Sequence, residues 1–269
     1  MKFVNSNNIS IFQFESFPSK DLFHFSSTTQ GGVSNGPYTS LNLSPYSGDN
    51  PDCLSENKER IANIMGVSVE NLYIPYQTHG DKILVIDEVF LNENDQEKDN
   101  LLKGIDALIT NQKGICIGIM TADCVPVLIY DKKKNIFAAI HAGWKGTVAK
   151  IAGKTVEKMI KQFGCNAEDL VAGIGPCISS KHFEVGEEVV DIFSSTGFIL
   201  KDIAFRNTET GKMHFDLQLA NKLILNEAGI ALDSIECANL CTYTNSEIFF
   251  SARRQTIRSG RMLTGGILR

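Results

Sequence analysis

The sequence lacks the features that would place the protein in a membrane or on a nucleic acid. No stretch approaches the roughly 18 consecutive apolar residues that a membrane-spanning helix requires. The formal net charge of −5 provides no basic surface for nucleic acid or anionic lipid. The N-terminal segment is too polar to supply the apolar core of a signal peptide. We therefore expect a cytoplasmic protein that acts on small molecules, with neither nucleic acid nor membrane as a partner.

Histidine is scarce, and cysteine is present in an odd number. Five histidines are too few for a multicopper enzyme, which needs many more imidazoles to reduce oxygen. Seven cysteines cannot all pair with one another, and a reducing compartment disfavours disulfides. We expect mostly buried free thiols, with structural roles for Cys237 and Cys241. The glycine pairs at 31–32 and 265–266 complete no dinucleotide or P-loop motif, so any phosphate must be bound by local donors.

The composition is that of one globular domain. A chain of 269 residues with 43% hydrophobic content can bury a substantial core, and the linker-like stretch 92–100 indicates an exposed loop. We predict a single domain over residues 1–269. In three segments apolar residues recur at helical spacing, and a glycine suited to a left-handed cap follows each segment. The predicted helices are residues 56–65, 145–163 and 217–228, the last with Asp216 as its N-cap.

Short apolar runs bounded by Gly, Asn, Asp or Lys predict strands that are buried in a packed sheet. These strands are residues 72–76, 83–86, 107–110, 115–120, 125–130, 136–140, 170–174 and 248–251. Several of them follow one another without an intervening helix, whereas parallel neighbours usually need a helix-sized connection. The predicted fold class is therefore α+β, with a mixed or antiparallel β-sheet core flanked by helices.

Two histidines and one cysteine stand where predicted strands end. His79 lies in the segment QTHG, Cys124 lies in TADCVP, and His141 lies in HAGWKG. Two imidazoles and a thiolate can bind a catalytic zinc that keeps its fourth position open, and copper accepts the same ligands. The spacing is not a recognised zinc signature, however. A lone histidine is more often a surface residue, and a cysteine in such a setting is more often a buried thiol.

The same residues allow a second chemistry. With Cys124 as nucleophile and His141 as base, the protein would be a thiol hydrolase or deamidase. Asp123 is not expected to be the third member, because adjacent residues of an extended chain point to opposite faces. This hypothesis leaves His79 without a role. Structural roles are predicted for the remaining histidines, His24, His182 and His214.

Three further residues are candidates for substrate contacts. Arg60, on the first predicted helix, has the planar fork that binds phosphate, but beside an acidic residue it can equally be a solvated surface residue. Asn42, between two leucines, can turn its amide toward a pocket or stabilise a turn. Lys145 follows the His141 turn and is a second candidate for phosphate. Trp144 is expected to pack the turn that directs His141 and not to contact substrate.

Six motifs occur in an order that resembles a known family. They are SLNL at 40–43, QTHG at 77–80, ADCVP at 122–126, HAGWKG at 141–146, GIGPCI at 173–178 and SGRM at 259–262. Over nearly its whole length the chain resembles the multicopper-oxidase-like, "laccase domain" family of purine nucleoside phosphorylases. The resemblance implies a β-sheet core flanked by helices, similar to the catalytic domain of cytotoxic necrotising factor. It also implies that His79, Cys124 and His141 bind a single zinc ion.

The activities implied by the resemblance are phosphorolysis and deamination. Family members are credited with converting adenosine, inosine, guanosine and methylthioadenosine, with phosphate, to base and ribose 1-phosphate, and with deaminating adenosine. The leading hypothesis is a zinc-dependent purine nucleoside phosphorylase, monomeric or homodimeric, with Asn42, Arg60 and Lys145 on substrate. The alternatives are a Cys-His amide hydrolase, as in members described as peptidoglycan-editing factors, and a polyphenol oxidase that uses copper.

Overall fold

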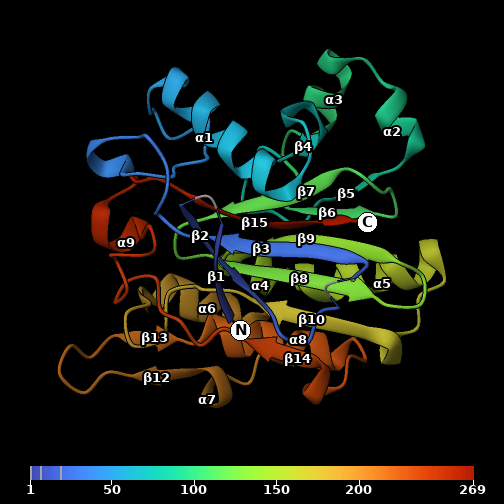
Figure 1. Cartoon of the computed structure of the whole chain (residues 1–269). Helices are drawn as coiled ribbons and strands as arrows, with labels where there is room; N and C mark the ends of the chain where they lie inside the picture. Colours follow the sequence, from blue (N-terminus) through green and yellow to red (C-terminus); the bar gives the residue numbers. More distant parts are fainter. Residues whose placement is uncertain (1, 7, 19) are drawn as a thin grey trace.

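Two six-stranded sheets face one another at the centre of the protein (Figure 1). The computed structural model describes residues 2–6, 8–18 and 20–269. The first sheet has the order β1-β2-β3-β15-β7-β4, so the last strand of the chain lies between two earlier ones. Its strands are β1 (Lys2–Ser6), β2 (Ile9–Gln13), β3 (Leu22–Ser27), β4 (Leu72–Tyr73), β7 (Cys116–Thr121) and β15 (Met262–Leu268).

The second sheet has the order β14-β10-β8-β9-β6-β5. Its strands are β5 (Ile83–Ile86), β6 (Ala107–Thr110), β8 (Val125–Asp131), β9 (Ile136–Ala142), β10 (Leu170–Ile174) and β14 (Ile235–Cys237). Parallel pairs β4–β7, β5–β6 and β10–β14 occur beside antiparallel ones, so both large sheets are mixed. A small antiparallel sheet joins β11 (Glu184–Val185), β12 (Ala204–Arg206) and β13 (Met213–Phe215).

The four central strands of the second sheet, β10, β8, β9 and β6, are buried on both faces. On β9, Phe137 and Ala139 pack into the core between the two sheets. The alternate residues Ile136, Ala138 and Ile140 pack into a second core on the opposite face. Because successive side chains of a strand point to opposite faces, a strand covered on both sides is apolar throughout. This is why the predicted strands in this region are continuous apolar runs.

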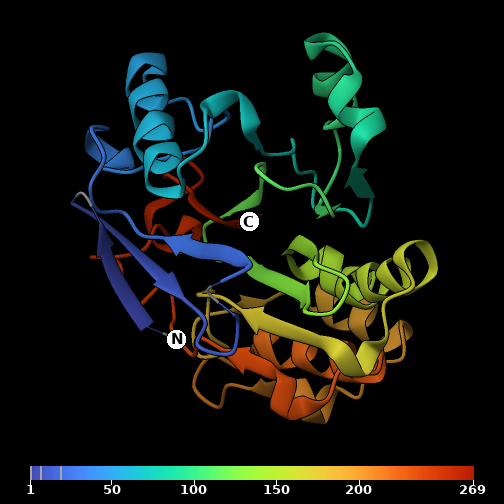
Figure 2. The same cartoon turned by 45° about the vertical axis from the view of Figure 1, so that its right-hand side comes forward.

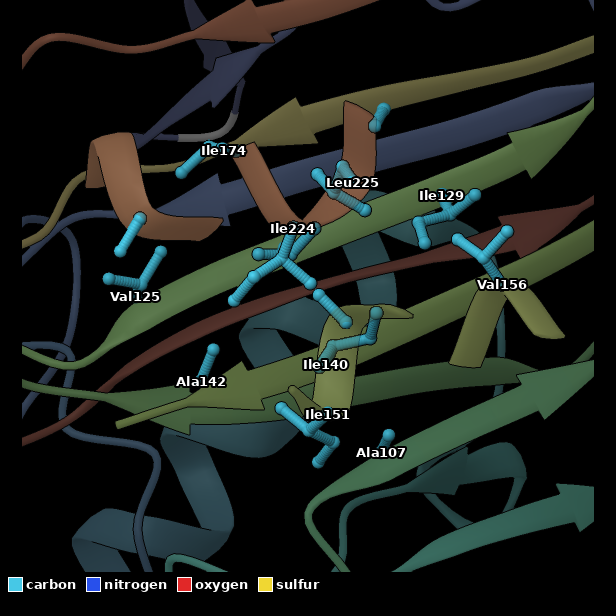
Figure 3. Packing of buried hydrophobic residues seen from close by; sticks show 14 of the residues in the cluster. Ala107, Val125, Ile129, Ile140, Ala142, Ile151, Val156, Ile174, Ile224 and Leu225 are labelled. Carbon is cyan, nitrogen blue, oxygen red and sulfur yellow. The ribbon is translucent and has the colours of Figure 1, made fainter. Parts of the chain in front are cut away.

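Helices cover the outer faces of the sheets. On the second sheet, α5 (Ile151–Phe163) and α8 (Leu217–Glu227) pack Ile151 and Ile224 near Ile140 (Figure 3). On the first sheet, α1 (Pro51–Met65) contributes Ile61 and Met65 to a third core. The shorter helices are α2 (Glu88–Asn92), α3 (Asp95–Leu101), α4 (Trp144–Val148), α6 (Glu187–Ser195), α7 (Leu200–Ile203) and α9 (Ala252–Gln255). The predicted α+β class, with mixed sheets flanked by helices, is confirmed.

Two predicted segments have a different structure. Residues 92–100 include most of a helix, α3, which with α2 projects from the edge of the second sheet at β5 (Figure 2). Phe90 of α2 packs into the core between the sheets. The Asn94 side chain caps α3 by accepting a hydrogen bond from the Glu97 N–H, and acidic residues occupy its first turn, where the helix dipole favours them. The predicted helix 145–163 is broken at Lys150, whose φ of 54° lies in the left-handed region. The break separates α4 from α5.

The strand predictions were wrong or incomplete at several positions, because there tertiary packing determines the backbone structure and the local sequence pattern does not. Residues 248–251 do not form a strand: a turn ends at Ile248 and a bend follows at Phe249. Phe249 and Phe250 are apolar because they are fully buried beside β15. Conversely, β15 contains Gly265 and Gly266, residues that normally weaken a strand. A Cβ at Gly265 would lie 2.3 Å from the Ile117 carbonyl oxygen, so glycine is required by close backbone approach. Strands β1 to β3 and β11 to β14 were also missed by the sequence pattern.

The cysteines are unpaired, as expected, but fewer than half of them are buried. All seven cysteines are free thiols; Cys116, Cys165 and Cys177 are buried and the other four are half-buried. The Cys241 sulfur accepts a hydrogen bond from the Ser179 N–H at 3.3 Å. Within the described part of the chain, no helix has both the length and the apolar character needed to cross a bilayer.

Candidate metal centre

His79, Cys124 and His141 meet at one end of the second sheet. On the antiparallel strands β8 and β9, Pro126 pairs with His141, which brings Cys124 beside the end of β9. The loop before β5 adds His79. The ligand atoms of the three side chains all lie within 4.8 Å of one another, and they are the one group of this kind found in the described residues. Strand register therefore brings together residues that are distant in sequence.

The loop that carries His79 is held by its own backbone and by Gln77. The Gln77 amide donates to the Met120 carbonyl at 2.9 Å and accepts from the Met120 N–H at 2.7 Å, which fixes the loop to β7. The next three N–H groups, of Thr78, His79 and Gly80, all donate to one carboxylate, that of Asp106. His79 itself has a φ of 62°, an uncommon conformation for a residue with a side chain. The QTHG motif is thus a loop whose hydrogen bonds fix the position of the candidate ligand His79.

Asp106 is the residue that sequence reasoning missed. It is fully buried, and its Oδ1 accepts a hydrogen bond from Nδ1 of His141 at 2.8 Å while the same carboxylate receives the N–H groups of the His79 loop. The bond leaves Nε2 of His141 as the ligand atom. Carboxylates in this position orient metal-binding histidines and increase their basicity. The available sequence signal was an acidic residue directly before an apolar strand, in the segment GIDAL.

The turn before Cys124 is fixed by a second carboxylate. Asp123 has a φ of 93°, and its two oxygens accept hydrogen bonds from the Thr242 hydroxyl at 2.6 Å and from the Arg253 N–H at 2.7 Å. Because both of its oxygens make these bonds, Asp123 does not serve as the hydrogen-bond partner of His141. That partner is Asp106. The Cys124 thiol is half-buried and His79 is exposed, whereas His141 is only 2% exposed.

The electrostatics of the cluster favour a thiolate. Burial by itself raises the pKa of the Cys124 thiol, but the charge of His141 and hydrogen bonds with His141 and His79 lower that pKa below its ordinary value. Burial also lowers the pKa of His141, but Cys124 and Asp106 raise it above its ordinary value overall. Without a metal the pair therefore favours thiolate and imidazolium. A thiolate is the form of cysteine that binds metals and acts as a nucleophile.

The donor set and its surroundings fit one metal ion. Ligand distances of about 2.0 to 2.3 Å around zinc place tetrahedral donors roughly 3.5 Å apart, so the three side chains need only a small closure. Gly143 stands against all three: a Cβ there would lie 3.1 Å from the Cys124 sulfur, 3.1 Å from His79 Cδ2 and 3.6 Å from His141 Cε1. The absence of a side chain at this position lets the ligands converge. Two nitrogens and one sulfur suit zinc, and they suit copper as well.

A cavity of about 630 Å³ opens over the three side chains. It is lined by residues of the segments 44–47, 75–79, 120–124 and 252–261, with His141, Ile178 and Phe183. The polar groups at its wall include the Arg253 and Arg261 side chains, neither of which the sequence singled out as a site residue. The cavity is large enough for a small-molecule ligand, since such sites span about 300 to 1,000 Å³.

The residues predicted to contact substrate are not among the described residues that line this cavity. Asn42 is fully buried; its amide accepts from the Arg261 N–H and donates to Ser47 and Asp49, which orders the 42–49 loop. Arg60 bonds to Glu56 and to the Gly31 carbonyl. Lys145 lies on α4, its Nζ 5.6 Å from the centre of the Trp144 ring. That ring packs partly buried against the core behind β9, as expected.

Fold and site together define the class: an α+β protein with paired mixed sheets and a candidate metal centre of two imidazoles and a thiol. The chain belongs to the family described as multi-copper polyphenol oxidoreductase laccase, which matches residues 23–269. Over 245 residues, covering 91% of each chain, it is 47% identical to a protein of Bacteroides thetaiotaomicron named purine nucleoside phosphorylase.

Two further relatives bear on activity and fold. A protein named adenosine deaminase RL5, from an unknown prokaryotic organism, is 42% identical over 240 residues, which cover 89% of this chain and 91% of the relative. The crystal structure of YlmD from Geobacillus stearothermophilus superposes with a TM-score of 0.90 at 28% identity, covering 99% of this chain and 98% of the other. Relatives of this chain thus bear the names of two enzymes that act on purine nucleosides.

Proposed function

We propose that the protein is a zinc-dependent purine nucleoside phosphorylase with adenosine deaminase activity at the same site. The observation that carries the proposal is the His-Cys-His cluster at the base of a cavity of nucleoside-compatible size. The names of the relatives support it. The substrates are adenosine, inosine, guanosine and methylthioadenosine, each with phosphate. The protein is further proposed to be a single domain that acts in the cytoplasm as a monomer or homodimer.

Three side chains would hold the ion, and one carboxylate positions two of them. His79, Cys124 and His141 are the ligands, and Asp106 keeps the proton on Nδ1 of His141 so that Nε2 stays free to bind. When bound, the ion supplies Lewis acidity at the base of the cavity. Five histidines in the whole chain make multicopper oxidase chemistry a poor alternative, although copper itself fits the donor set.

An exposed aromatic pair at the rim of the cavity supports a purine substrate. The rings of Tyr46 and Tyr76 meet edge to face with centroids 4.6 Å apart, although these side chains are 61% and 44% exposed. Aromatic rings so exposed offer flat apolar area on which a purine can stack. Both tyrosines line the cavity that contains the metal ligands. We expect the purine base of a bound nucleoside to contact these rings.

The second candidate is a cysteine-dependent amide hydrolase. Asp106, His141 and Cys124 form a connected series in which the carboxylate orients the imidazole and the imidazole favours the thiolate. This is the arrangement that a thiol nucleophile needs. The hydrolase would tolerate chelators and substitution of His79, whereas the phosphorylase would tolerate neither.

The test is a nucleoside panel with metal analysis. Purified protein loaded with zinc is incubated with each nucleoside and phosphate, and base, ribose 1-phosphate and ammonia are measured. We expect base and ribose 1-phosphate in equal amounts, and loss of both zinc and turnover in Cys124→Ala. Cys53→Ala, which removes a half-buried thiol on α1, serves as the matched control. Chelator-resistant cleavage of amides without nucleoside turnover would favour the hydrolase.

A further inference from the structure

Two arginines from the C-terminal part of the chain line the cavity that contains the metal ligands. Arg253 lies on α9, and Arg261 directly precedes β15. The backbone of each residue is held in place: the Arg253 N–H donates to Asp123, next to Cys124, and the Arg261 N–H donates to the buried side chain of Asn42. The segment 252–261 therefore fixes two guanidinium groups relative to the thiol.

Both guanidinium groups are anchored by neutral acceptors. Arg253 donates from Nη1 to the His182 carbonyl at 3.3 Å and from Nη2 to the Glu184 carbonyl at 3.1 Å, and it lies over the Phe183 ring at 5.5 Å. Arg261 donates from Nη1 to the carbonyl and hydroxyl of Ser259 and to the Gly260 carbonyl, and from Nη2 to the Ile257 carbonyl. Carbonyl anchors hold a guanidinium in place without neutralising its charge.

Two other arginines of the chain, Arg60 and Arg206, show a contrast. Arg60 pairs with Glu56 at 2.8 Å and Arg206 pairs with Glu187 at 2.9 Å, as surface arginines commonly do. In the described residues no carboxylate forms an ion pair with Arg253 or Arg261. The carboxylate at the cavity wall, Asp123, has both oxygens engaged by the Thr242 hydroxyl and a backbone N–H.

The position of Arg261 relative to the cluster adds a second line of support. Burial lowers the pKa of its guanidinium, while the nearby Cys124 thiol and Asp123 carboxylate act in the opposite direction. The Arg261 guanidinium therefore lies close enough to Cys124 for a Coulombic interaction. A half-buried, immobilised guanidinium beside the reacting region is suited to an oxyanion, because its planar fork matches two oxygens at once.

We propose that Arg253 and Arg261 form the binding site for the inorganic phosphate that takes part in the reaction. The proposal rests on the proposed function, and it replaces Arg60 and Lys145 as the phosphate contacts. In the reaction an oxygen of hydrogen phosphate forms a bond to C1′ of the ribose and the C1′–N9 bond breaks. The purine keeps the electron pair of that bond and takes up the proton that the phosphate loses. The guanidinium groups of Arg253 and Arg261 hold the phosphate by hydrogen bonds and charge, and they form no bond to the ribose.

The experiment measures phosphate binding and phosphate kinetics in zinc-loaded protein. Calorimetric titration with inorganic phosphate and steady-state kinetics are applied to Arg253→Gln and Arg261→Gln. We expect the Kd and the KM for phosphate to rise about tenfold or more in each, which is the effect of losing a charged hydrogen bond. The KM for nucleoside should change much less. Arg253→Lys and Arg261→Lys keep the charge but lose the planar guanidinium group. Their Kd and KM for phosphate should therefore lie between those of the Gln variants and those of the parent protein.

The matched control is Arg254→Gln, next to Arg253 on α9. The Arg254 guanidinium donates to the Tyr243 carbonyl, lies 5.4 Å from the Tyr243 ring centre, and is not among the residues lining the cavity. The Arg254→Gln variant should therefore have the same Kd and KM for phosphate as the parent protein. Equal losses in Arg254→Gln and the other two variants, or unchanged phosphate constants in all of them, would overturn the proposal. Thermal melting identifies any variant that is unfolded. If a Gln variant is unfolded, the Lys variant at the same position takes its place in the comparison.

The two proposals can fail separately. Phosphate binding that depends on both arginines in a protein without nucleoside turnover would support the anion site and refute the phosphorylase. Phosphorolysis with a phosphate KM that is indifferent to both arginines would support the phosphorylase and refute the anion site.

Discussion

Asp106 connects two of the three candidate ligands through a single carboxylate. It orients His141 and also receives the backbone of the loop that presents His79. Burial raises the pKa of this carboxyl, but the His141 side chain and the N–H donors of Gly80 and Thr78 lower it below its ordinary value. The candidate metal site is therefore organised around an anion that is not itself one of the three candidate ligands.

Replacing Asp106 with Asn is expected to weaken metal binding by roughly 10- to 100-fold, the usual effect of losing such a carboxylate. The amide can accept from His141, but its NH₂ group would face the N–H donors of Thr78 and Gly80. Competition with a chelating indicator measures the affinity. Asp169→Asn, which removes a surface ion pair with Lys133, is the control and should leave affinity unchanged. Equal affinity in the two variants would refute the role of Asp106.

Gly143 offers a purely steric test of the cluster. Its φ of −65° suits any residue, so Gly143→Ala introduces no backbone strain. The added methyl would stand 3.1 Å from both the Cys124 sulfur and His79 Cδ2, so zinc affinity should fall while thermal stability changes little. At Gly80 a Cβ would come no closer than 3.5 Å to any atom outside its chain neighbours, and Gly80→Ala should therefore keep more of the affinity. An affinity order opposite to this one would contradict the geometry.

Among the secondary-structure elements, those fixed by local signals agree best with prediction. The glycine caps at Gly66 and Gly164 have the expected left-handed φ, and Asp216 caps α8 as expected. The break at Lys150 and the strand β15 depend on tertiary packing, which no local pattern records. The three candidate ligands could be predicted from the sequence because their motifs lie at the ends of predicted strands. The role of Asp106 could not be predicted, because it depends on the register of β6 against β9.

His24 joins β3 to the segment after β2 and makes the stability of the first sheet sensitive to pH. Its Nε2 accepts the Phe14 N–H at 2.8 Å, and burial lowers its pKa from 6.5 to about 4. The unfolded chain takes up a proton near pH 6.5 and the folded protein does so only near pH 4, so stability is lost as pH falls through this interval. The loss amounts to about 3 kcal/mol at most.

Urea unfolding between pH 7 and pH 4.5 measures this effect. His24→Gln, whose side-chain oxygen can accept the same N–H, should show a shallower fall in unfolding free energy over the interval. Equal slopes in the variant and the parent protein would show that His24 does not titrate as described.

For the molecule as a whole, the site depends on assembly of the fold. The cavity draws on segments near residues 44, 76, 122 and 257, and both large sheets contribute to its base. Ligands contributed by separate segments bind metal only when the chain is folded, so zinc should raise the melting temperature, and above Kd the shift should grow with the logarithm of the free zinc concentration. Differential scanning calorimetry with and without zinc measures this shift. The absence of a shift in the parent protein would argue against a metal site.

The most direct test of the central claim is a zinc titration of metal-free protein, with bound zinc and purine release measured in the same samples. Adenine release from adenosine and phosphate should rise in proportion to bound zinc and reach its maximum at one ion per chain. Full turnover by protein that contains no metal, or zinc binding that leaves turnover unchanged, would contradict the account.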